Sequence, residues 1–207
     1  MSYYPLHLNI EYKTVVIIGG GHVALQKVEA LLPAKAKIVV VSPQVTTELQ
    51  KYIATEAITW HQKEFEPADL DDAAMVFAVT NRTDVNDAVE QATQHWQLLS
   101  RADGKGRMDF INPAVVRRGD LVLTVSTSGA SPKLTRQVKA QLAEHYGEHY
   151  STYVAFLGAA RQEILANFNG EQKNQLLSDL LEPQLFMWVQ QGKLEKCQAW
   201  LKHRLGE

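Results

Sequence analysis

Several features that would assign a chain to a special class of protein are scarce or missing from this 207-residue sequence. Its one cysteine, Cys197, excludes an intramolecular disulfide framework, a Cys-x-x-Cys zinc site and a cysteine-ligated iron–sulfur cluster. No apolar run approaches the roughly 20 residues that a membrane helix needs. The first residues contain neither a basic segment nor a long apolar segment typical of secretory signals. We therefore expect a cytoplasmic protein without a membrane partner.

Net charge is also low. A formal charge of −2 excludes a globally basic nucleic-acid-binding protein, and 45% hydrophobic residues are typical of ordinary globular chains. The charges are unevenly placed, since residues 1–100 carry 7 Lys and Arg against 12 Asp and Glu, whereas residues 101–140 carry 8 against 3. This basic stretch favours an anionic ligand. The alternative is a solvated surface that acidic residues elsewhere balance, and the sequence leaves both open.

The first half of the chain alternates between strand and helix patterns. Short apolar or β-branched runs predict strands over 14–18, 37–41, 75–79 and 98–102, with a weaker one over 58–63. Apolar stripes at helical spacing predict helices over 22–32, 45–54 and 82–96. Strands separated by helices indicate βαβ units, so we expect an α/β fold with an N-terminal Rossmann-like parallel sheet.

The pattern changes after residue 103. Two more strands are predicted over 108–112 and 121–126, followed by a helix from Pro132 to about Tyr146 with Ser131 as its N-cap. The rest is predicted to be helical over 157–168, 173–181 and 194–205, with breaks at Gly170, Pro183 and Gly192. This gives a Rossmann-like domain at 1–112, a mixed strand–helix segment at 113–146 and an all-helical tail at 147–207.

The strongest local motif is Gly19-x-Gly21-x-x-Ala24, between the first predicted strand and helix. The first glycine permits a tight turn, the second lets the backbone approach a pyrophosphate, and Ala24 allows the helix to pack closely on the strand. Free N–H groups at the helix N-terminus favour phosphate. The motif predicts dinucleotide binding, and the alternative is a purely structural turn.

The end of the second strand lacks the Asp or Glu that usually binds the adenosine ribose. Ser42, Pro43 and Gln44 stand there instead, so the Ser42 hydroxyl or the backbone would have to bind the ribose. No arginine follows directly to meet a 2′-phosphate. NAD is therefore favoured over NADP.

Two later motifs are candidate sites. Asp103 follows the fifth strand, where ligands of parallel sheets bind, so its carboxylate is either a general base or a turn cap. The hydroxyl-rich stretch 126–131 precedes a predicted helix, so it is either a second anion cradle or a capping loop. His145 and His149 would share a helix face if the helix continued through Gly147. No third ligand is evident, and we predict no metal site.

In this order, the motifs resemble the siroheme-synthase dehydrogenase family, the precorrin-2 dehydrogenases, some of which are also sirohydrochlorin ferrochelatases. The ordered set is more specific than any one motif and covers about residues 1–145. It comprises Tyr4-Pro5-Leu6 with Leu8, Gly19–Ala24 with Lys27, Val39–Pro43, Phe77–Asn81, Asp103, Asp109–Ala114, Arg118-Gly119 and Ser126–Pro132.

The resemblance implies an NAD-dependent enzyme that oxidises precorrin-2, a tetrapyrrole rich in carboxylates, to sirohydrochlorin in siroheme biosynthesis. It implies an NAD-binding domain at 1–112, a segment at 113–146 that forms a homodimer, and a tail at 147–207 that covers the substrate. It places the essential aspartate at Asp103. The implied cofactor contacts are Gly19, Gly20, Gly21, His22, Val23, Ala24, Ser42, Pro43, Gln44, Thr80 and Asn81, and the implied substrate contacts are Ser126, Thr127, Ser128, Arg118 and Lys133.

The sequence departs from the family pattern near the essential aspartate. Ser100-Arg101 replaces the usual Asn-Val, and the loop 104–107 is Gly-Lys-Gly-Arg. The serine that some members phosphorylate aligns best with Thr127. Whether the protein also inserts Fe²⁺ stays open. Two other classes of function also stay open: an NAD-sensing regulatory module without tetrapyrrole turnover, and a tetrapyrrole or metal chaperone that does not need NAD.

Overall fold

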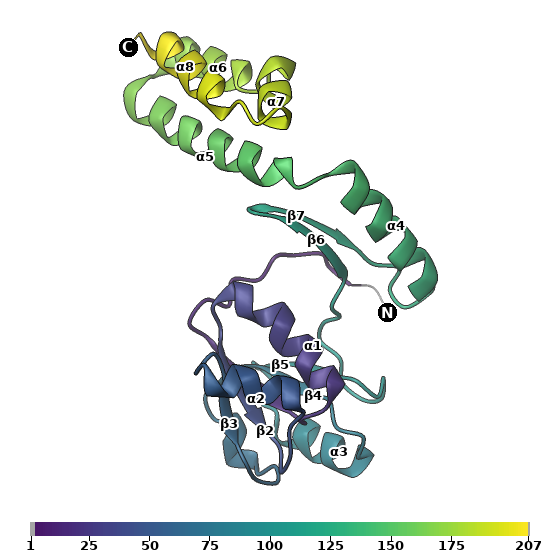
Figure 1. Cartoon of the computed structure of the whole chain (residues 1–207). Coiled ribbons are helices and arrows are strands. Elements are labelled where there is room, and N and C mark those ends of the chain that lie inside the picture. The colour runs from purple at the N-terminus through teal and green to yellow at the C-terminus, as the bar shows by residue number, and fades with distance from the viewer. Residues whose placement is uncertain (1–2, 207) are drawn as a thin grey trace. The chain divides into compact units, whose positions relative to one another are not determined.

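The computed structural model describes residues 3–206, and the chain forms two compact units, Met1–Asn112 and Pro113–Glu207 (Figure 1). Within residues 3–206, every helix is too short or too polar to cross a membrane. The same residues contain no group of three or more His, Cys, Asp or Glu side chains placed to hold a metal ion.

A five-stranded parallel sheet forms the centre of the first unit. The strands are β1 (Thr14–Ile18), β2 (Lys37–Val41), β3 (Thr59–His61), β4 (Ala73–Ala78) and β5 (Leu98–Arg101), in the order β3-β2-β1-β4-β5. The strand order reverses between β1 and β4. In open parallel sheets this switch point leaves a crevice beyond the carboxyl ends of the strands, where ligands bind.

Helices cover both faces of this sheet. They are α1 (His22–Leu31), α2 (Thr47–Ala54) and α3 (Thr83–Ala92), with single 3₁₀ turns at η1 (Leu32–Ala34) and η2 (Pro67–Leu70). Val15 and Ile17 of β1 pack with α1 and α2, whereas Val16 and Ile18 pack with α3 and η2. Burial on both faces explains the unbroken β-branched run, because each such side chain contributes about 1.5–3 kcal/mol when buried.

Two sequence predictions in this unit are wrong. The third helix ends at Ala92 and not at residue 96, because the backbone leaves the helical conformation at Thr93, whose ψ is 121°. Residues 108–112 form no strand. Asp109 is the residue of this stretch that bonds to β5: its N–H donates to the Leu99 carbonyl oxygen, and its carboxylate accepts from the Leu99 N–H. Pro113 lacks the N–H that would extend a strand ladder.

The second unit begins with an antiparallel hairpin of β6 (Ala114–Arg118) and β7 (Leu121–Val125). Residues 115–119 were expected to connect the strands predicted over 108–112 and 121–126, but residues 115–118 belong to β6, Val116 is buried, and Gly119 makes the turn with a φ of 57°. Helix α4 (Pro132–His145) begins as predicted, with the Ser131 hydroxyl accepting from the Leu134 N–H (3.3 Å). At the C-terminal end of α4, the Arg118 guanidinium donates a hydrogen bond to the Tyr146 carbonyl oxygen (2.8 Å).

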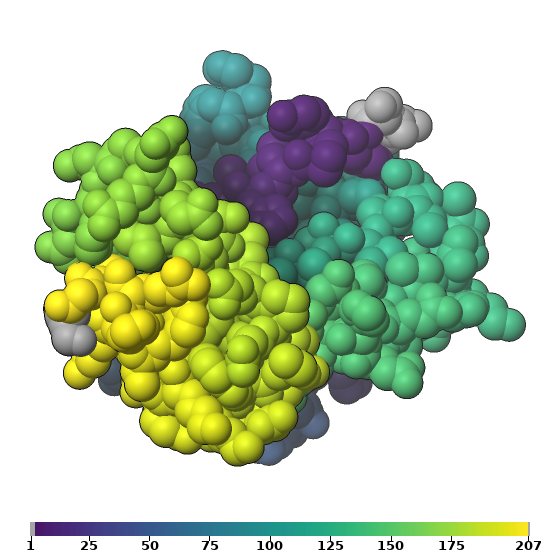
Figure 2. Space-filling view, turned by 90° about the horizontal axis from the view of Figure 1, so that it is seen from above, coloured from purple at the N-terminus to yellow at the C-terminus, as the bar shows by residue number. Residues whose placement is uncertain are grey.

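Four helices complete this unit: α5 (His149–Asn167), α6 (Gly170–Asp179), α7 (Pro183–Gln190) and α8 (Leu194–Leu205). Their core includes Ile164, Leu185 and Cys197. In Figure 2 the light-green and yellow segments of α6, α7 and α8 form one continuous surface. Pro183 is the first residue of a helix and not only a break. His145 and His149 belong to different helices, so the shared face considered for a metal does not exist.

Candidate functional site

A cavity of about 700 Å³ lies beyond the carboxyl ends of β1, β2 and β4. Its lining includes ten of the cofactor residues expected from the sequence: Gly19, Gly20, Gly21, His22, Val23, Ser42, Pro43, Gln44, Thr80 and Asn81. Ala24 does not line it, because its methyl group is buried in the core under α1. The topology thus brings the three segments together at the switch point of the sheet.

The glycine turn, Gly19–Gly21, requires its glycines for different reasons. Gly19 has a φ of 125°, a conformation that only glycine adopts readily. A Cβ at Gly20 would lie 2.0 Å from the Gln44 carbonyl oxygen, so a side chain cannot fit there. A Cβ at Gly21 would have no atom of the described residues within 4 Å.

Open space at Gly21 coincides with the start of α1. Gly21 is the N-cap of that helix, and no side chain of the described residues caps it. The free N–H groups and the positive end of the helix dipole therefore remain available to an anion. These features fit a dinucleotide, with its pyrophosphate beside Gly21.

Ser42 stabilises the turn at residues 42–44, which forms one wall of the cavity. Its hydroxyl donates to the Gln44 carbonyl oxygen (2.7 Å), and the Trp60 indole N–H donates to the Ser42 carbonyl oxygen (2.9 Å). Glu64 and Arg82, which were not predicted from the sequence, also line the cavity. Both follow a strand of the sheet, so the strand-end rule that found Asp103 could have found them.

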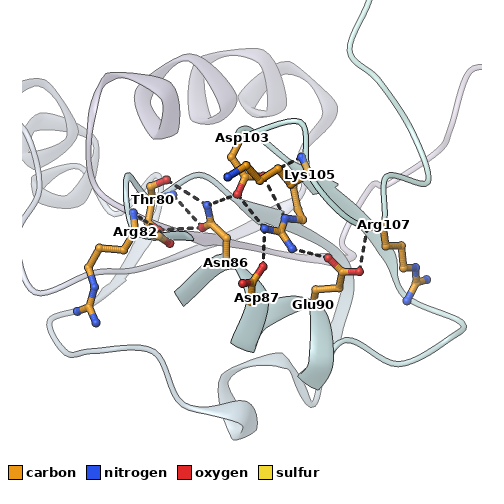
Figure 3. Close-up of polar contacts among 9 residues, drawn as sticks. Thr80, Arg82, Asn86, Asp87, Glu90, Asp103, Lys105 and Arg107 are labelled. Atoms are coloured by element: carbon orange, nitrogen blue, oxygen red, sulfur yellow. Dashed lines mark hydrogen bonds and ion pairs between the residues drawn. The ribbon is translucent and has the colours of Figure 1, made fainter. Parts of the chain in front are cut away.

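Asp103 is linked to the cavity by two side chains. The buried Asn86 amide donates to Asp103 Oδ2 (3.3 Å) and to the Thr80 carbonyl oxygen (3.2 Å), as Figure 3 shows. The Thr80 hydroxyl donates to Asn86 Oδ1 (2.8 Å). Thr80 lines the cavity, so one chain of hydrogen bonds connects the wall of the cavity to the candidate catalytic carboxylate.

Arg101 holds the other side of Asp103, and only 2% of its side chain is exposed. Its Nε and Nη2 donate to Asp103 Oδ1 (3.1 Å) and Oδ2 (2.8 Å). The same guanidinium binds Asp87 Oδ1 (2.8 Å) and the Glu90 carboxylate, both on α3 (Figure 3). We call Asp87, Glu90, Arg101 and Asp103 the Arg101 cluster.

This arrangement sets the charge states of its members. The Arg101 guanidinium holds the pKa of Asp103 far below its usual range, helped by the Lys105 backbone N–H and Asn86, although burial acts in the opposite direction. Asp103 in turn raises the pKa of Arg101. Asp103 is therefore ionised from mildly acidic pH upward.

Internal partners also account for other cations of the basic stretch. Arg107 pairs with Asp109 (2.9 Å) and donates to the Gln97 carbonyl oxygen (2.7 Å), and Arg118 binds the end of α4. The exposed cations of residues 101–140 are Lys105, Arg117, Lys133, Arg136 and Lys139. An anionic ligand could still bind these exposed cations, so that expectation stays a prediction. Arg118, by contrast, already binds carbonyl oxygens at the end of α4.

The hydroxyl-rich loop before α4 is organised by its own side chains. The Ser131 N–H donates to Thr127 Oγ1 (3.0 Å), and the Ser128 N–H donates to Ser126 Oγ (3.0 Å). Ser126 and Ser128 are exposed, while Thr127 also contacts Thr135 Oγ1 (3.0 Å). The capping role is therefore present, and a substrate role for these hydroxyls stays a prediction.

The parallel sheet, the glycine turn and the cavity at the switch point define a dinucleotide-binding α/β protein. Residues 6–114 match a family described as NAD(P)-binding, and residues 118–145 match a family described as sirohaem biosynthesis protein central. The chain belongs to the precorrin-2 dehydrogenase family, which forms the N-terminal part of siroheme synthases.

Three similar proteins show how far the likeness extends. A precorrin-2 dehydrogenase of Priestia megaterium is 31% identical over 182 residues, which cover 87% of this chain and 90% of that protein. Siroheme synthase 1 of Aeromonas salmonicida is 34% identical over 169 residues, covering 81% of this chain but 36% of that protein. The solved structure of SirC, precorrin-2 dehydrogenase, superposes with a TM-score of 0.83 at 30% identity, covering 99% of this chain and 100% of that one.

The relatives differ in length. This chain spans less than half of the siroheme synthases that it matches, with 36% of the Aeromonas salmonicida protein and 45% of the Nitrosospira multiformis protein covered. What those longer proteins do as a whole is therefore not transferred to this chain.

Proposed function

We propose that this protein is an NAD-dependent precorrin-2 dehydrogenase that forms sirohydrochlorin. The observation that carries this proposal is the hydrogen-bonded link from the cavity wall at Thr80 through Asn86 to Asp103. It joins a dinucleotide pocket to a carboxylate at the end of β5, where a substrate of an open parallel sheet would lie.

The residues of the chain would act by binding and alignment. The glycine turn and the start of α1 would hold the pyrophosphate, and Thr80 and Asn81 would meet the nicotinamide end. NAD, when bound, supplies the acceptor for a hydride from the macrocycle. Asp103 would either remove the accompanying proton or orient the substrate for its loss.

The choice of NAD over NADP has support in the charged side chains that line the cavity. Arg82 is the one Lys or Arg among the described residues that line the cavity, and it pairs with Asp84 (2.7 Å) and faces Glu64 (3.9 Å). A 2′-phosphate would meet the Glu64 carboxylate without a free cation. We expect NAD to bind at least about tenfold more tightly than NADP, since one unpaired charge costs at least about 1.4 kcal/mol. Equal dissociation constants in a fluorescence titration would contradict this preference.

A homodimer is part of the proposal. Helix α4 buries none of its residues within the described chain, and Leu134 on it is 49% exposed. Tyr4 and Leu6 near the N-terminus are 85% and 60% exposed. A second copy of the chain would cover such apolar surface. Light scattering after gel filtration should give twice the mass of 23.2 kDa, and a monomer at micromolar concentration would refute the dimer.

Anaerobic turnover of precorrin-2, followed by absorbance with and without NAD, tests the enzyme proposal. Sirohydrochlorin that forms only with NAD would support it. Bound NAD without turnover would favour the regulatory module, and bound tetrapyrrole without a need for NAD would favour the chaperone. Added Fe²⁺ extends the same assay, because insertion faster than in the enzyme-free control would identify a ferrochelatase.

A further inference from the structure

A buried arginine that the proposed reaction does not use stands at the end of β5. Arg101 is 2% exposed at its side chain, so it cannot reach a substrate carboxylate. It lies among the carboxylates of Asp87, Glu90 and Asp103. Burying a guanidinium is costly unless it is paired, and here every side of its planar group meets an acid. These contacts indicate that Arg101 fixes the positions of the neighbouring carboxylates.

We propose that Arg101 is a positioning residue that keeps Asp103 as a fixed carboxylate, so that Asp103 acts through its negative charge and does not take up the proton. This inference rests on the proposed dehydrogenase function and excludes one of the two roles left open for Asp103, the removal of the proton.

Hydrogen-bond donors occupy both oxygens of Asp103. Oδ1 accepts from Arg101 Nε (3.1 Å) and the Lys105 N–H (3.2 Å), and Oδ2 accepts from Arg101 Nη2 (2.8 Å) and Asn86 Nδ2 (3.3 Å). A proton arriving at either oxygen would displace one of these donors. A carboxylate stabilised in this way is a weak base, and efficient general bases have a pKa near the working pH.

The charge of the cluster suggests what Asp103 does instead. Three carboxylates share one guanidinium, so the Arg101 cluster remains net negative even with the exposed Lys105 beside it. A hydride leaves precorrin-2 for NAD, and this makes the macrocycle more positive. A fixed negative charge stabilises that change without reorganising. One proton then passes to solvent water, so the products are sirohydrochlorin, NADH and a proton.

The proposal predicts a pH dependence that separates it from a purely structural role. The charged groups around Asp103 are Arg101 on β5, Asp87 and Glu90 on α3, and Lys105 in the following loop. In Arg101→Met three neighbouring carboxylates lose their shared cation, so at least one of them should bind a proton more readily. Arg101→Lys keeps the charge but not the two-pronged geometry.

The kcat of the full-length chain with NAD and precorrin-2 should be measured from pH 5 to pH 9. We expect a wild-type profile without an acidic limb from Asp103. Arg101→Met should lose about tenfold or more in kcat at pH 8 and fall further below about pH 6, whereas Arg101→Lys should restore the flat profile with part of the rate. The KM for NAD should change less than about twofold, because Arg101 does not line the cavity.

Arg107→Met is the matched control, because Arg107 lies in the loop after β5 and pairs with Asp109 instead of Asp103. It should lower the melting temperature and leave the profile flat. The proposal is overturned if Arg101→Met keeps the wild-type kcat and profile, or if the wild type has an acidic limb that disappears in Asp103→Asn.

A second measurement does not need turnover. In protein carrying ¹³C at the aspartate side-chain carboxyls, the Asp103 signal is the one missing from Asp103→Asn. It should not shift between pH 7 and pH 4 in the wild type, and it should titrate above pH 4 in Arg101→Met. A wild-type signal that titrates near the ordinary aspartate value would overturn the inference. If the ¹³C signals behave as expected but the protein does not turn over precorrin-2, the role of Arg101 in keeping Asp103 ionised is supported and the proposed function is refuted.

Discussion

The glycine turn and the Arg101 cluster lie in the same compact unit, but the first is formed by backbone atoms and the second by charged side chains. The turn is made of backbone: a φ of 125° at Gly19, a Gly20 with no room for a Cβ beside the Gln44 carbonyl oxygen, and open space at Gly21. The cluster is made of side chains from β5, α3 and the loop between residues 102 and 107. A backbone site depends on which residues are absent, whereas a side-chain site depends on partners that must all be present.

This difference suggests a division of labour. The glycine turn should determine whether the dinucleotide binds, and the Arg101 cluster should determine how fast the bound complex reacts. Four changes test that division, beginning with the largest expected effect.

Gly21→Asp should abolish NAD binding, with a loss of about 100-fold or more, because it sets a negative charge against the pyrophosphate at the start of α1. The melting temperature should hardly change, since a Cβ at Gly21 meets no described atom within 4 Å. Isothermal titration with NAD measures the effect, and Gly21→Ala is the control without the charge. Unaltered NAD affinity in Gly21→Asp would refute the assignment of the turn.

Asp103→Ala should lower turnover of precorrin-2 by about 100-fold while NAD affinity stays within about twofold. Asp103 does not line the cavity, and its partner Arg101 retains Asp87 and Glu90. Steady-state kinetics with a parallel NAD titration separates the two effects. A variant that turns over normally would remove Asp103 from the mechanism.

Asp103→Asn should change the pH dependence of stability. The pKa of Asp103 is lowered in the folded protein, so its contribution is present above the unfolded pKa of about 3.9 and is lost as the pH falls below it. We expect the variant to lose about 1.5–3 kcal/mol at pH 7 and to show a shallower decline from pH 5 to pH 3. Urea unfolding at several pH values measures this, and parallel curves for the two proteins would contradict it.

Ser42→Ala should have the smallest effect. It removes the bond from the Ser42 hydroxyl to the Gln44 carbonyl oxygen, worth about 1 kcal/mol. NAD affinity should fall only a few-fold, because the glycine turn remains intact. A loss as large as that in Gly21→Asp would mean that the hydroxyl, and not the backbone, governs binding at this wall.

The same contrast explains what the sequence could predict. Four of the five strands were found because each contains a short apolar run that is buried on one or both faces, whereas β3 was expected only from a weak alternation. The glycine motif was found because its spacing is local. The predicted strand over residues 108–112 was wrong, because its apolar residues flank Asp109, whose carboxylate accepts from the Leu99 N–H of β5 instead.

The Arg101 cluster was missed for a related reason. Arg101 was counted among eight cations of a basic stretch, and the partners that neutralise it are 11 and 14 residues earlier on another element. The acids Asp87 and Glu90 are three residues apart and so share one face of α3, which was the local hint from that helix. A pairing between β5 and α3 emerges only when the sheet is assembled.

The most direct test of the division of labour is a single-turnover experiment under anaerobic conditions. A preformed complex of the protein with NAD is mixed with precorrin-2, and NADH formation is followed for the wild type and for Asp103→Ala at saturating NAD. We expect the wild-type rate to exceed the rate of the variant by about 100-fold. Equal rates would show that the cluster around Asp103 takes no part in the chemical step.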